Sequence, residues 1–250
     1  MSGNTGHSGP FKRLVVLGES TVEGGGWLAS PQERWADLLW KQLEVAQERS
    51  MFYFNAGLGA SVISPRSPGY EDSVKPSAAE RLDKRVIAKK PDLLVIAYGL
   101  NDMRAGMVAD AFIGEIKEII QRIRKLLDPL IVLVNVYHMS DYQFYPPFNR
   151  GSISRTRLYN RILRDFAREN NCVYADIWQA QAQKNHLIHP DTVHANKVGN
   201  MIIANKVFEA IVLAAPEITA NVLRRDLKTS WTRECRIQQH SAVEKSHNSY

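Results

Sequence analysis

DLLVIAYGLND, residues 92–102, starts as an unbroken apolar run and ends in Gly, Asn and Asp. The run does not alternate between polar and apolar positions, which is typical of a strand covered by helices on both faces. Four similar runs occur elsewhere, so the pattern belongs to the whole chain. The expected strands are residues 12–18, 51–57, 92–99, 130–137 and 172–178.

The segments between these runs predict helices. Their apolar residues recur three and four positions apart, and the first segment opens with Pro31, which is favoured in the first turn of a helix. Strands that alternate with helices predict a parallel sheet, and here a flavodoxin-like three-layer α/β/α fold with a five-stranded parallel sheet. The expected helices are residues 31–49, 75–90, 109–127, 152–169 and 195–214.

The length of 250 residues fits one large α/β domain. We expect a flexible N-terminus over residues 1–11 and one globular domain over residues 12–214. The apolar pattern fades from about residue 216, so residues 215–250 are expected to form a partly disordered C-terminal appendage.

Composition narrows the function classes. The net charge is +6, but the basic residues are spread out, so we expect no nucleic-acid partner. No apolar run approaches the ~18–20 residues that cross a bilayer, so we expect no membrane span. The start of the chain lacks the apolar stretch of a secretory signal, and the expected location is cytoplasmic. The oligomeric state is left open.

Small and polar residues gather where the predicted strands end. Ser20 follows the first strand, Asn55–Ser61 follows the second, and Asn101 follows the third. The segment His189–Asn196 stands directly before the last helix. The carboxyl ends of parallel strands meet at one edge of a sheet. These side chains together provide a nucleophile, a base, a carboxylate and amide donors, which is the set that acyl transfer needs.

The histidine-rich stretch HLIHPDTVH, residues 186–194, has a second interpretation as a metal site. Its histidine spacing matches no standard zinc pattern, and Pro190 prevents one continuous helix. We therefore expect no metal and no cofactor. The alternative is half of a nucleophilic triad, because Asp191 and His194 are three residues apart and the carboxylate can reach the imidazole.

The chain thus has four polar blocks, around Ser20, Asn55–Ser61, Asn101 and His189–Asn196. In this order they resemble the blocks of the SGNH hydrolases, also called the GDSL esterase/lipase family, and the resemblance covers roughly residues 12–214. The resemblance implies that Ser20 is the nucleophile, that Asp191 and His194 complete the catalytic triad, and that Asn101 donates to the oxyanion. It also implies a helix that carries a tryptophan near its start, as PQERWADLLW does. The G-x-S-x-G elbow of the other large serine-hydrolase fold is absent.

Two positions depart from the family pattern. Glu19 stands where the family usually has Asp, one methylene shorter. Ala60 stands where the family usually has a Gly that gives an oxyanion N–H. A backbone N–H does not require Gly, so Ala60 can serve, and Gly57 is the alternative donor beside the N–H of Ser20.

The resemblance implies a serine carboxylic ester hydrolase that works through an acyl-enzyme on a small-molecule ester, with short-chain esters or O-acetylated sugars as the expected substrates. Three alternatives stay open: a lysophospholipase or thioesterase, an acyltransferase of the same family, and a catalytically inactive binding protein.

The connection after the fourth strand, residues 138–151, is long for an α/β unit and rich in aromatic residues. We expect Tyr142 and Tyr145 to line the substrate pocket, since aromatic rings offer flat apolar surface to an acyl chain or a sugar. The alternative is that these rings only pack over the edge of the sheet.

Overall fold

A computed structural model describes residues 9–143, 145 and 148–228. Its strands form one parallel sheet in the order β2-β1-β3-β4-β5. β2 is added on one side of β1 and the later strands on the other, so the switch point of the sheet lies between β1 and β3. The predicted fold class is confirmed, and this order is the flavodoxin-like one, whose switch point is where ligands bind. The strands are β1 (Arg13–Gly18), β2 (Phe52–Gly57), β3 (Leu93–Ala97), β4 (Leu130–Val134) and β5 (Val173–Ala175).

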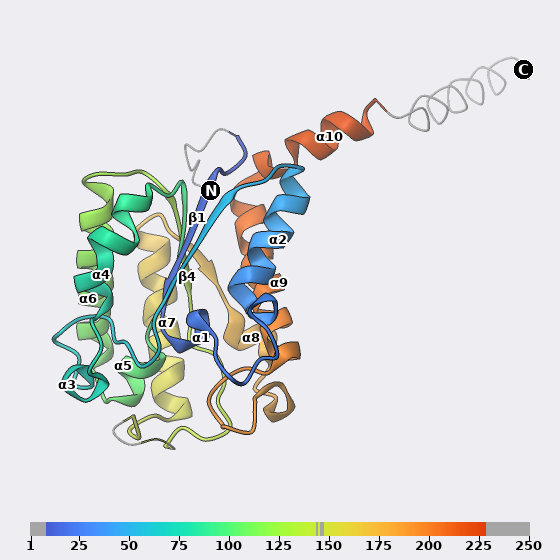
Figure 1. Ribbon diagram of the computed structural model, residues 1–250. Coiled ribbons are helices and arrows are strands. Elements are labelled where there is room, and N and C mark those ends of the chain that lie inside the picture. Colours follow the sequence, from blue (N-terminus) through green and yellow to red (C-terminus); the bar gives the residue numbers. More distant parts are fainter. Residues whose placement is uncertain (1–8, 144, 146–147, 229–250) are drawn as a thin grey trace, which may run out of the picture.

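Helices cover both faces of the sheet (Figure 1). Every residue of β3 and β4 is buried, which explains why these strands are unbroken apolar runs in the sequence. One face is covered by α4 (Ala78–Arg85), α6 (Ala109–Arg124) and α7 (Ile153–Glu169), and the other by α2 (Trp35–Gln47) and α9 (Lys197–Ala214).

The ends of several elements differ from the prediction. β4 ends at Val134 because the Asn135 side chain accepts the backbone N–H groups of Ile177 and Trp178, which turns the chain away from the ladder. Residues 31–33 form a 3₁₀ turn, and α2 begins only at Trp35. Three short helices were not predicted: α1 (Ser20–Glu23), α3 (Tyr70–Ser73) and α5 (Leu100–Arg104). A further short helix, α8 (Ile177–Gln181), follows β5.

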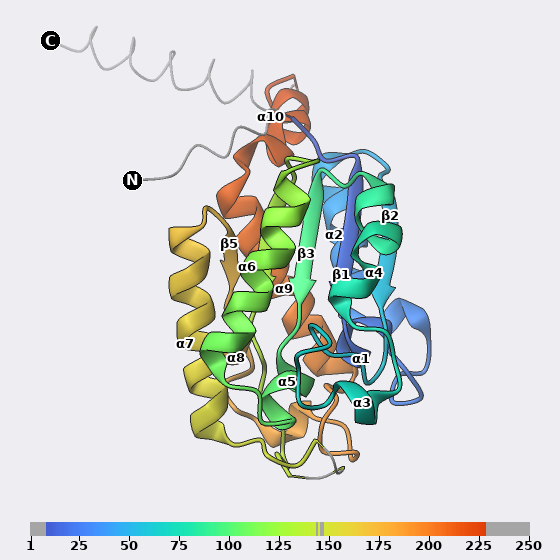
Figure 2. The same cartoon turned by 90° about the vertical axis from the view of Figure 1, so that its left-hand side faces the viewer.

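The two ends of the described chain lie at the amino end of the sheet, opposite α1 and α5 (Figure 2). Phe11 is fully buried and its N–H donates to Gln47 Oε1, so the packed part of the chain begins before residue 12. After α9, a 3₁₀ turn (Pro216–Thr219) leads into α10 (Ala220–Asp226). The end of the appendage, residues 229–250, lies outside the described residues.

No single helix in the described part of the chain is long and apolar enough to cross a membrane. The pair Lys197–Ala214 and Pro216–Asp226 passes that test together, by length and composition only, and it is bent by 97°. Within this pair, α9 packs against α2 and α8, as the core helix of a folded domain does.

Candidate active site

The switch point of the sheet brings the first and third polar blocks together. Gly18 at the end of β1 is in register with Ala97 at the end of β3. Ser20 is the first residue of α1, and Asn101 lies in the first turn of α5. Both helices lie directly beyond the carboxyl ends of the strands (Figure 2).

Ser20, His194 and Asp191 form one chain of hydrogen bonds. His194 Nε2 is 2.8 Å from Ser20 Oγ, and His194 Nδ1 is 2.8 Å from Asp191 Oδ2. The side chains of His194 and Asp191 are only 15% and 16% exposed, so water competes weakly for these bonds. With Nδ1 donating to the carboxylate, Nε2 is free to accept the Ser20 proton.

The loop that carries Asp191 and His194 is fixed from two sides. Asp191 Oδ1 accepts the backbone N–H groups of Val193 and His194, at 3.0 and 2.9 Å. The Tyr137 hydroxyl, after β4, donates to the Val193 carbonyl. Partial burial disfavours the charged form of Asp191, but the hydrogen bonds from the His194 ring and backbone outweigh it and lower the pKa of Asp191 below its usual value. Asp191 is therefore a carboxylate at neutral pH.

Trp27 covers one face of the His194 ring. The two rings stack at 3.6 Å between centroids and 7° between planes. Trp27 lies on the loop after α1, which Glu33 holds through a hydrogen bond from the Ala29 N–H and an ion pair with Lys197. This contact could not be predicted from the sequence, because no motif pairs a loop tryptophan with a histidine far along the chain.

Three donors point to an oxyanion site. In the described chain, the backbone N–H groups of Ser20 and Ala60 have no hydrogen-bond acceptor. Asn101 is buried, and its Nδ2 donates one hydrogen to the Ser61 carbonyl at 3.0 Å, which leaves its second hydrogen available. Ala60 has a φ of 59°, the left-handed conformation that the family's Gly adopts at low cost.

Gly57, the alternative donor, is already engaged. Its N–H donates to Asn55 Oδ1 at 2.8 Å, and Asn55 Nδ2 donates to the Val22 carbonyl in α1. The neighbouring Gly59 N–H donates to Glu23 Oε2 at 2.6 Å. These bonds attach the second block to the nucleophile helix. Ala60 is therefore the better candidate for the oxyanion N–H.

Glu19 is buried beneath this site. Its two carboxylate oxygens accept the backbone N–H groups of Leu100 and Asn101, both at 3.1 Å. Burial, with the nearby charge of Asp102, raises the pKa of Glu19 to about 8, against the lowering effect of those two N–H groups and of Arg104. The longer side chain thus reaches from the end of β1 into the first turn of α5.

Arg81 ties three strand ends together from behind the site. Its guanidinium donates to the carbonyl oxygens of Ala56 and Gly18 and to the Tyr98 hydroxyl, at the ends of β2, β1 and β3. Trp35 adds a fourth brace, because its Nε1 donates to the Thr21 carbonyl of α1 at 2.7 Å. Arg81 had no sequence signal, whereas the tryptophan of the first long helix was expected from the family resemblance.

The aromatic loop after β4 lies beside the Asp191–His194 loop. The Ser140 N–H donates to the Thr192 carbonyl at 3.0 Å. The Tyr142 hydroxyl is 3.0 Å from His138 Nδ1, and its ring packs against the main core. Tyr145 is 48% exposed, and Phe148 is buried. Phe144, Pro146 and Pro147 lie outside the described residues.

The remaining histidines of the 186–194 stretch do not converge. His186 is exposed in a 3₁₀ turn (Asn185–Leu187), and its carbonyl accepts Asn196 Nδ2. His189 Nδ1 is 3.2 Å from both the backbone N–H and the carboxylate of Asp191. In the part of the chain that the structure describes, no group of three or more His, Cys, Asp or Glu side chains could hold a metal ion.

Residues 16–202 match the sequence model of the GDSL-like Lipase/Acylhydrolase family. The chain belongs to this family. It is an esterase-family hydrolase that acts on ester bonds, and its structure joins Ser20, His194 and Asp191 by hydrogen bonds. No curated protein gives a significant match to the chain.

Solved structures share the fold. A variant of an acetyl xylan esterase from Geobacillus stearothermophilus has a TM-score of 0.61 at 20% identity, covering 82% of this chain and 96% of its own. A carbohydrate acetylesterase family member from Sinorhizobium meliloti has a TM-score of 0.64 at 17% identity, with 81% and 98% covered. The lipase/acylhydrolase from Enterococcus faecalis has a TM-score of 0.61 at 19% identity, with 80% and 95% covered.

Proposed function

We propose that this GDSL-family protein is a serine esterase that removes short acyl groups, with O-acetylated sugars as its substrate class. The observation that carries the proposal is the bond chain from Ser20 through His194 to Asp191, each link at 2.8 Å. Two of the similar structures are described as esterases of acetylated carbohydrates, which supports the choice of substrate class.

The reaction follows from the proton positions. His194 Nε2 takes the proton of Ser20 as Oγ attacks the ester carbonyl, and Asp191 holds the imidazolium that forms. The N–H groups of Ser20 and Ala60 and the amide of Asn101 stabilise the oxyanion. The protonated His194 then gives its proton to the departing alcohol. Water, deprotonated by the same imidazole, releases the acid and restores Ser20.

A panel of 4-nitrophenyl esters of increasing acyl length, together with an acetylated xylo-oligosaccharide, tests this function. We expect the acetyl ester and the acetylated sugar to be turned over best, and Ser20→Ala to abolish both activities. An organophosphonate should label the wild type on Ser20 and leave Ser20→Ala unlabelled. Higher kcat/KM for long acyl chains would contradict the substrate class, and unchanged activity in Ser20→Ala would contradict the mechanism.

A further inference from the structure

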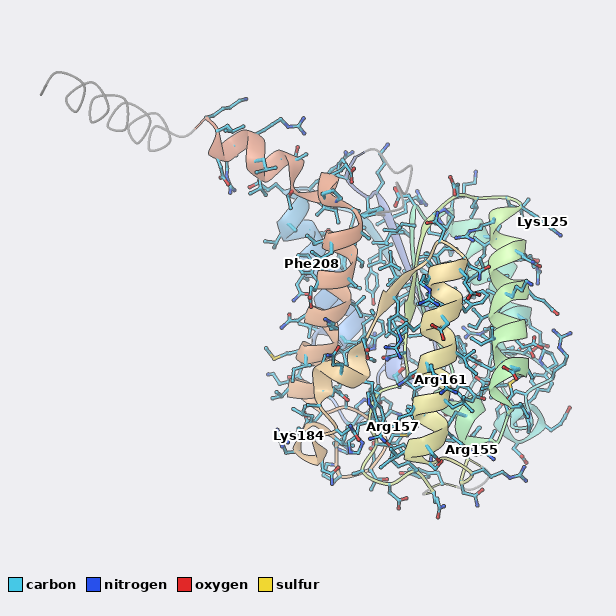
Figure 3. All side chains as sticks on the ribbon, turned by 180° about the vertical axis from the view of Figure 1, so that it is seen from behind. Lys125, Arg155, Arg157, Arg161, Lys184 and Phe208 are labelled. Carbon is cyan, nitrogen blue, oxygen red and sulfur yellow. The ribbon has the colours of Figure 1, made fainter. Side chains whose placement is uncertain are left out.

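A hollow lies on the side of the molecule where α7 faces α8. Its volume is about 530 Å³. One wall is the α7 surface that carries Arg157, Arg161 and Arg164. The other wall is formed by Tyr174, Asp176 and Trp178. Figure 3 shows this side from behind, with Arg157 and Arg161 on α7 and Lys184 beyond them.

The three arginines share one face of the helix. They are four and three residues apart, a spacing that places side chains in a row along a helix. All three are exposed, and in the described residues none of them has an ion pair or a side-chain hydrogen bond. By contrast, Arg168 on the same helix pairs with Asp165. Like charges at this spacing oppose each other, so the row lowers helix stability unless an anion binds it.

The one carboxylate in the lining, Asp176, forms no ion pair with the row in the described part of the chain. Asp176 Oδ1 accepts Asn135 Nδ2 at 2.8 Å and the Gln179 N–H at 3.1 Å, the second bond capping α8. The Tyr174 hydroxyl is likewise engaged, because it accepts Asn135 Nδ2 and donates to the Asn160 carbonyl. The hollow therefore offers guanidinium donors and aromatic surface to a ligand, while Asp176 Oδ1 and the Tyr174 hydroxyl are bonded within the protein.

The Trp178 ring forms part of the wall and contacts a buried histidine. Its ring meets His138 edge-on at 6.0 Å, and His138 is buried between the Tyr142 hydroxyl and Asn185 Oδ1. A partly exposed indole offers a flat apolar surface to a ligand. Guanidinium groups bind carboxylates in a bidentate way. A pyranose ring can lay its apolar C–H face on the indole, so a sugar ring that carries a carboxylate matches both features.

The hollow lies at the β5 edge of the sheet, and Ser20 follows β1, three strands away. At about 4.8 Å per strand the separation across the sheet is roughly 14 Å, a span that a chain of several sugars can cover. We propose that this Arg157–Arg161–Arg164 groove binds a carboxylate-bearing sugar residue of an acidic polysaccharide whose ester group lies at Ser20. This inference rests on the proposed sugar-ester function for its choice of ligand class.

Binding of oligogalacturonate, measured by calorimetry on the full chain, tests the groove. A neutral xylo-oligosaccharide of equal length is the reference ligand. We expect the acidic oligomer to bind more tightly, with an affinity that falls as salt increases. Arg161→Gln should weaken this binding about tenfold or more, the effect of losing one charged hydrogen-bonding group. The melting temperature of the variant shows that it is folded.

The matched control is Arg155→Gln. Arg155 is an exposed arginine of the same helix, two residues from Arg157 and outside the groove lining (Figure 3). We expect it to change the affinity less than about twofold. Equal losses in the two variants would overturn the proposal, because they would show a diffuse charge effect. Equal affinity for the acidic and neutral oligomers would overturn it as well.

Other anions are separate outcomes of the same experiment. A single-stranded oligonucleotide, or vesicles of anionic phospholipid, that bound more tightly than oligogalacturonate and depended on Arg161 would overturn the carbohydrate assignment. Oligogalacturonate carries no ester, so its binding does not depend on turnover. Lost binding with normal ester hydrolysis would refute the groove alone, and retained binding with no hydrolysis would refute the proposed function alone.

Discussion

Glu19 Oε2 accepts a hydrogen bond from the backbone N–H of Asn101 at 3.1 Å. The residue before the nucleophile therefore fixes the backbone of Asn101, the proposed oxyanion donor. The bond joins the ends of β1 and β3 across the switch point of the sheet. An Asp at this position would be one methylene too short to make the same bonds unless α5 lay closer to β1. The Glu at residue 19 therefore fits the observed position of α5, and substitutions of its buried carboxyl test how the site is built.

The first prediction concerns stability against pH. Burial and the charge of Asp102 raise the pKa of Glu19 from 4.5 to about 8, so the folded state favours the protonated form. As pH rises from 4.5 to 8, the unfolded chain loses this proton first and the folded state loses stability. We expect the free energy of unfolding of the wild type to fall across this window, by more than the ~1.4 kcal/mol that one pKa unit represents.

Glu19→Gln isolates this contribution, because the amide does not titrate. Urea unfolding at several pH values should show a smaller fall for the variant than for the wild type. Asp102, whose pKa burial raises to about 6, remains in both proteins and gives the residual fall. Asp191 acts in the opposite sense, but only below pH 3.8, because its pKa is lowered. Identical slopes in the two proteins would show that Glu19 does not carry the effect.

Ala60 gives the second prediction. Its φ of 59° is a conformation that L-residues adopt at a cost of roughly 1–2 kcal/mol and that Gly adopts freely. Ala60→Gly should therefore keep the N–H in place and retain kcat within a few fold. Ala60→Val should lower kcat, because a β-branched residue is an outlier in this region and would move the loop. Kinetics on 4-nitrophenyl acetate would check both variants, and equal kcat in Val and Gly would exclude Ala60 from the oxyanion site.

Asp191→Asn is the third prediction. The Asn Oδ1 can still accept the N–H groups of Val193 and His194, so the loop should stay folded. The new amide would donate to His194 Nδ1 and force the tautomer that cannot accept the Ser20 proton. In serine proteases this change costs about 10⁴ in kcat, and we expect a loss of about 10³–10⁴ here. His189→Ala is the control, because it also contacts Asp191, and we expect a mild effect.

A zinc-dependent mechanism would give a different pattern in the same measurements. If His189→Ala lost as much activity as Asp191→Asn, and if chelation abolished wild-type activity and zinc restored it, the triad assignment would fail. We expect activity to survive chelation.

The sequence was enough for the layers of the fold, and the reason is visible in β3 and β4. Both strands are buried on both faces, so their apolar runs are continuous and easy to recognise. The short helices α1 and α5 were missed because four or five residues are too few to show a helical period. The end of β4 was missed because the bonds of the Asn135 side chain, rather than its own polarity, stop the strand.

The site divides in the same way. Ser20, Asn101, Asp191 and His194 could be named because each stands in a short motif, after a strand for Ser20 and Asn101 and directly before α9 for Asp191 and His194. Long-range contacts could not be read from the sequence, since Trp27 on His194 and Arg81 on Gly18 depend on how distant segments pack. The choice between Gly57 and Ala60 also needed the structure, because it depends on which N–H is already bonded.

Trp27 is the subject of the fourth prediction. Its stacking on His194 restricts the rotation of the imidazole and favours the charged ring that forms during catalysis. Trp27→Ala should lower kcat about tenfold, as expected for losing roughly 1.4 kcal/mol, with little change in KM. Trp27→Phe should restore part of the loss. Leu28→Ala, one residue further on the same loop, is the control. An equal effect of Leu28→Ala would mean that the loop as a whole, rather than the stacked ring, matters.

The fifth prediction concerns the loop that follows β4. Ser140 attaches this loop to Thr192, between Asp191 and His194, and Tyr145 further along it is 48% exposed with a φ of 67°. Tyr145→Ala keeps a Cβ at this backbone position and removes only the ring. If the ring lines the substrate pocket, kcat/KM should change unequally across esters of different acyl or sugar groups, while Ser20 reacts equally fast with a small phosphonate.

Tyr142→Phe is the matched variant of the same loop. It removes the hydroxyl that contacts His138 Nδ1 and leaves the packed ring. Because this change removes only the contact with His138 and keeps the ring, which is the part expected to line the pocket, we expect a lower melting temperature and the same ratio of kcat/KM between esters as in the wild type. A uniform fall in activity in Tyr145→Ala, together with a lower melting temperature, would assign Tyr145 to loop packing, because a residue that only supports the fold cannot discriminate between esters.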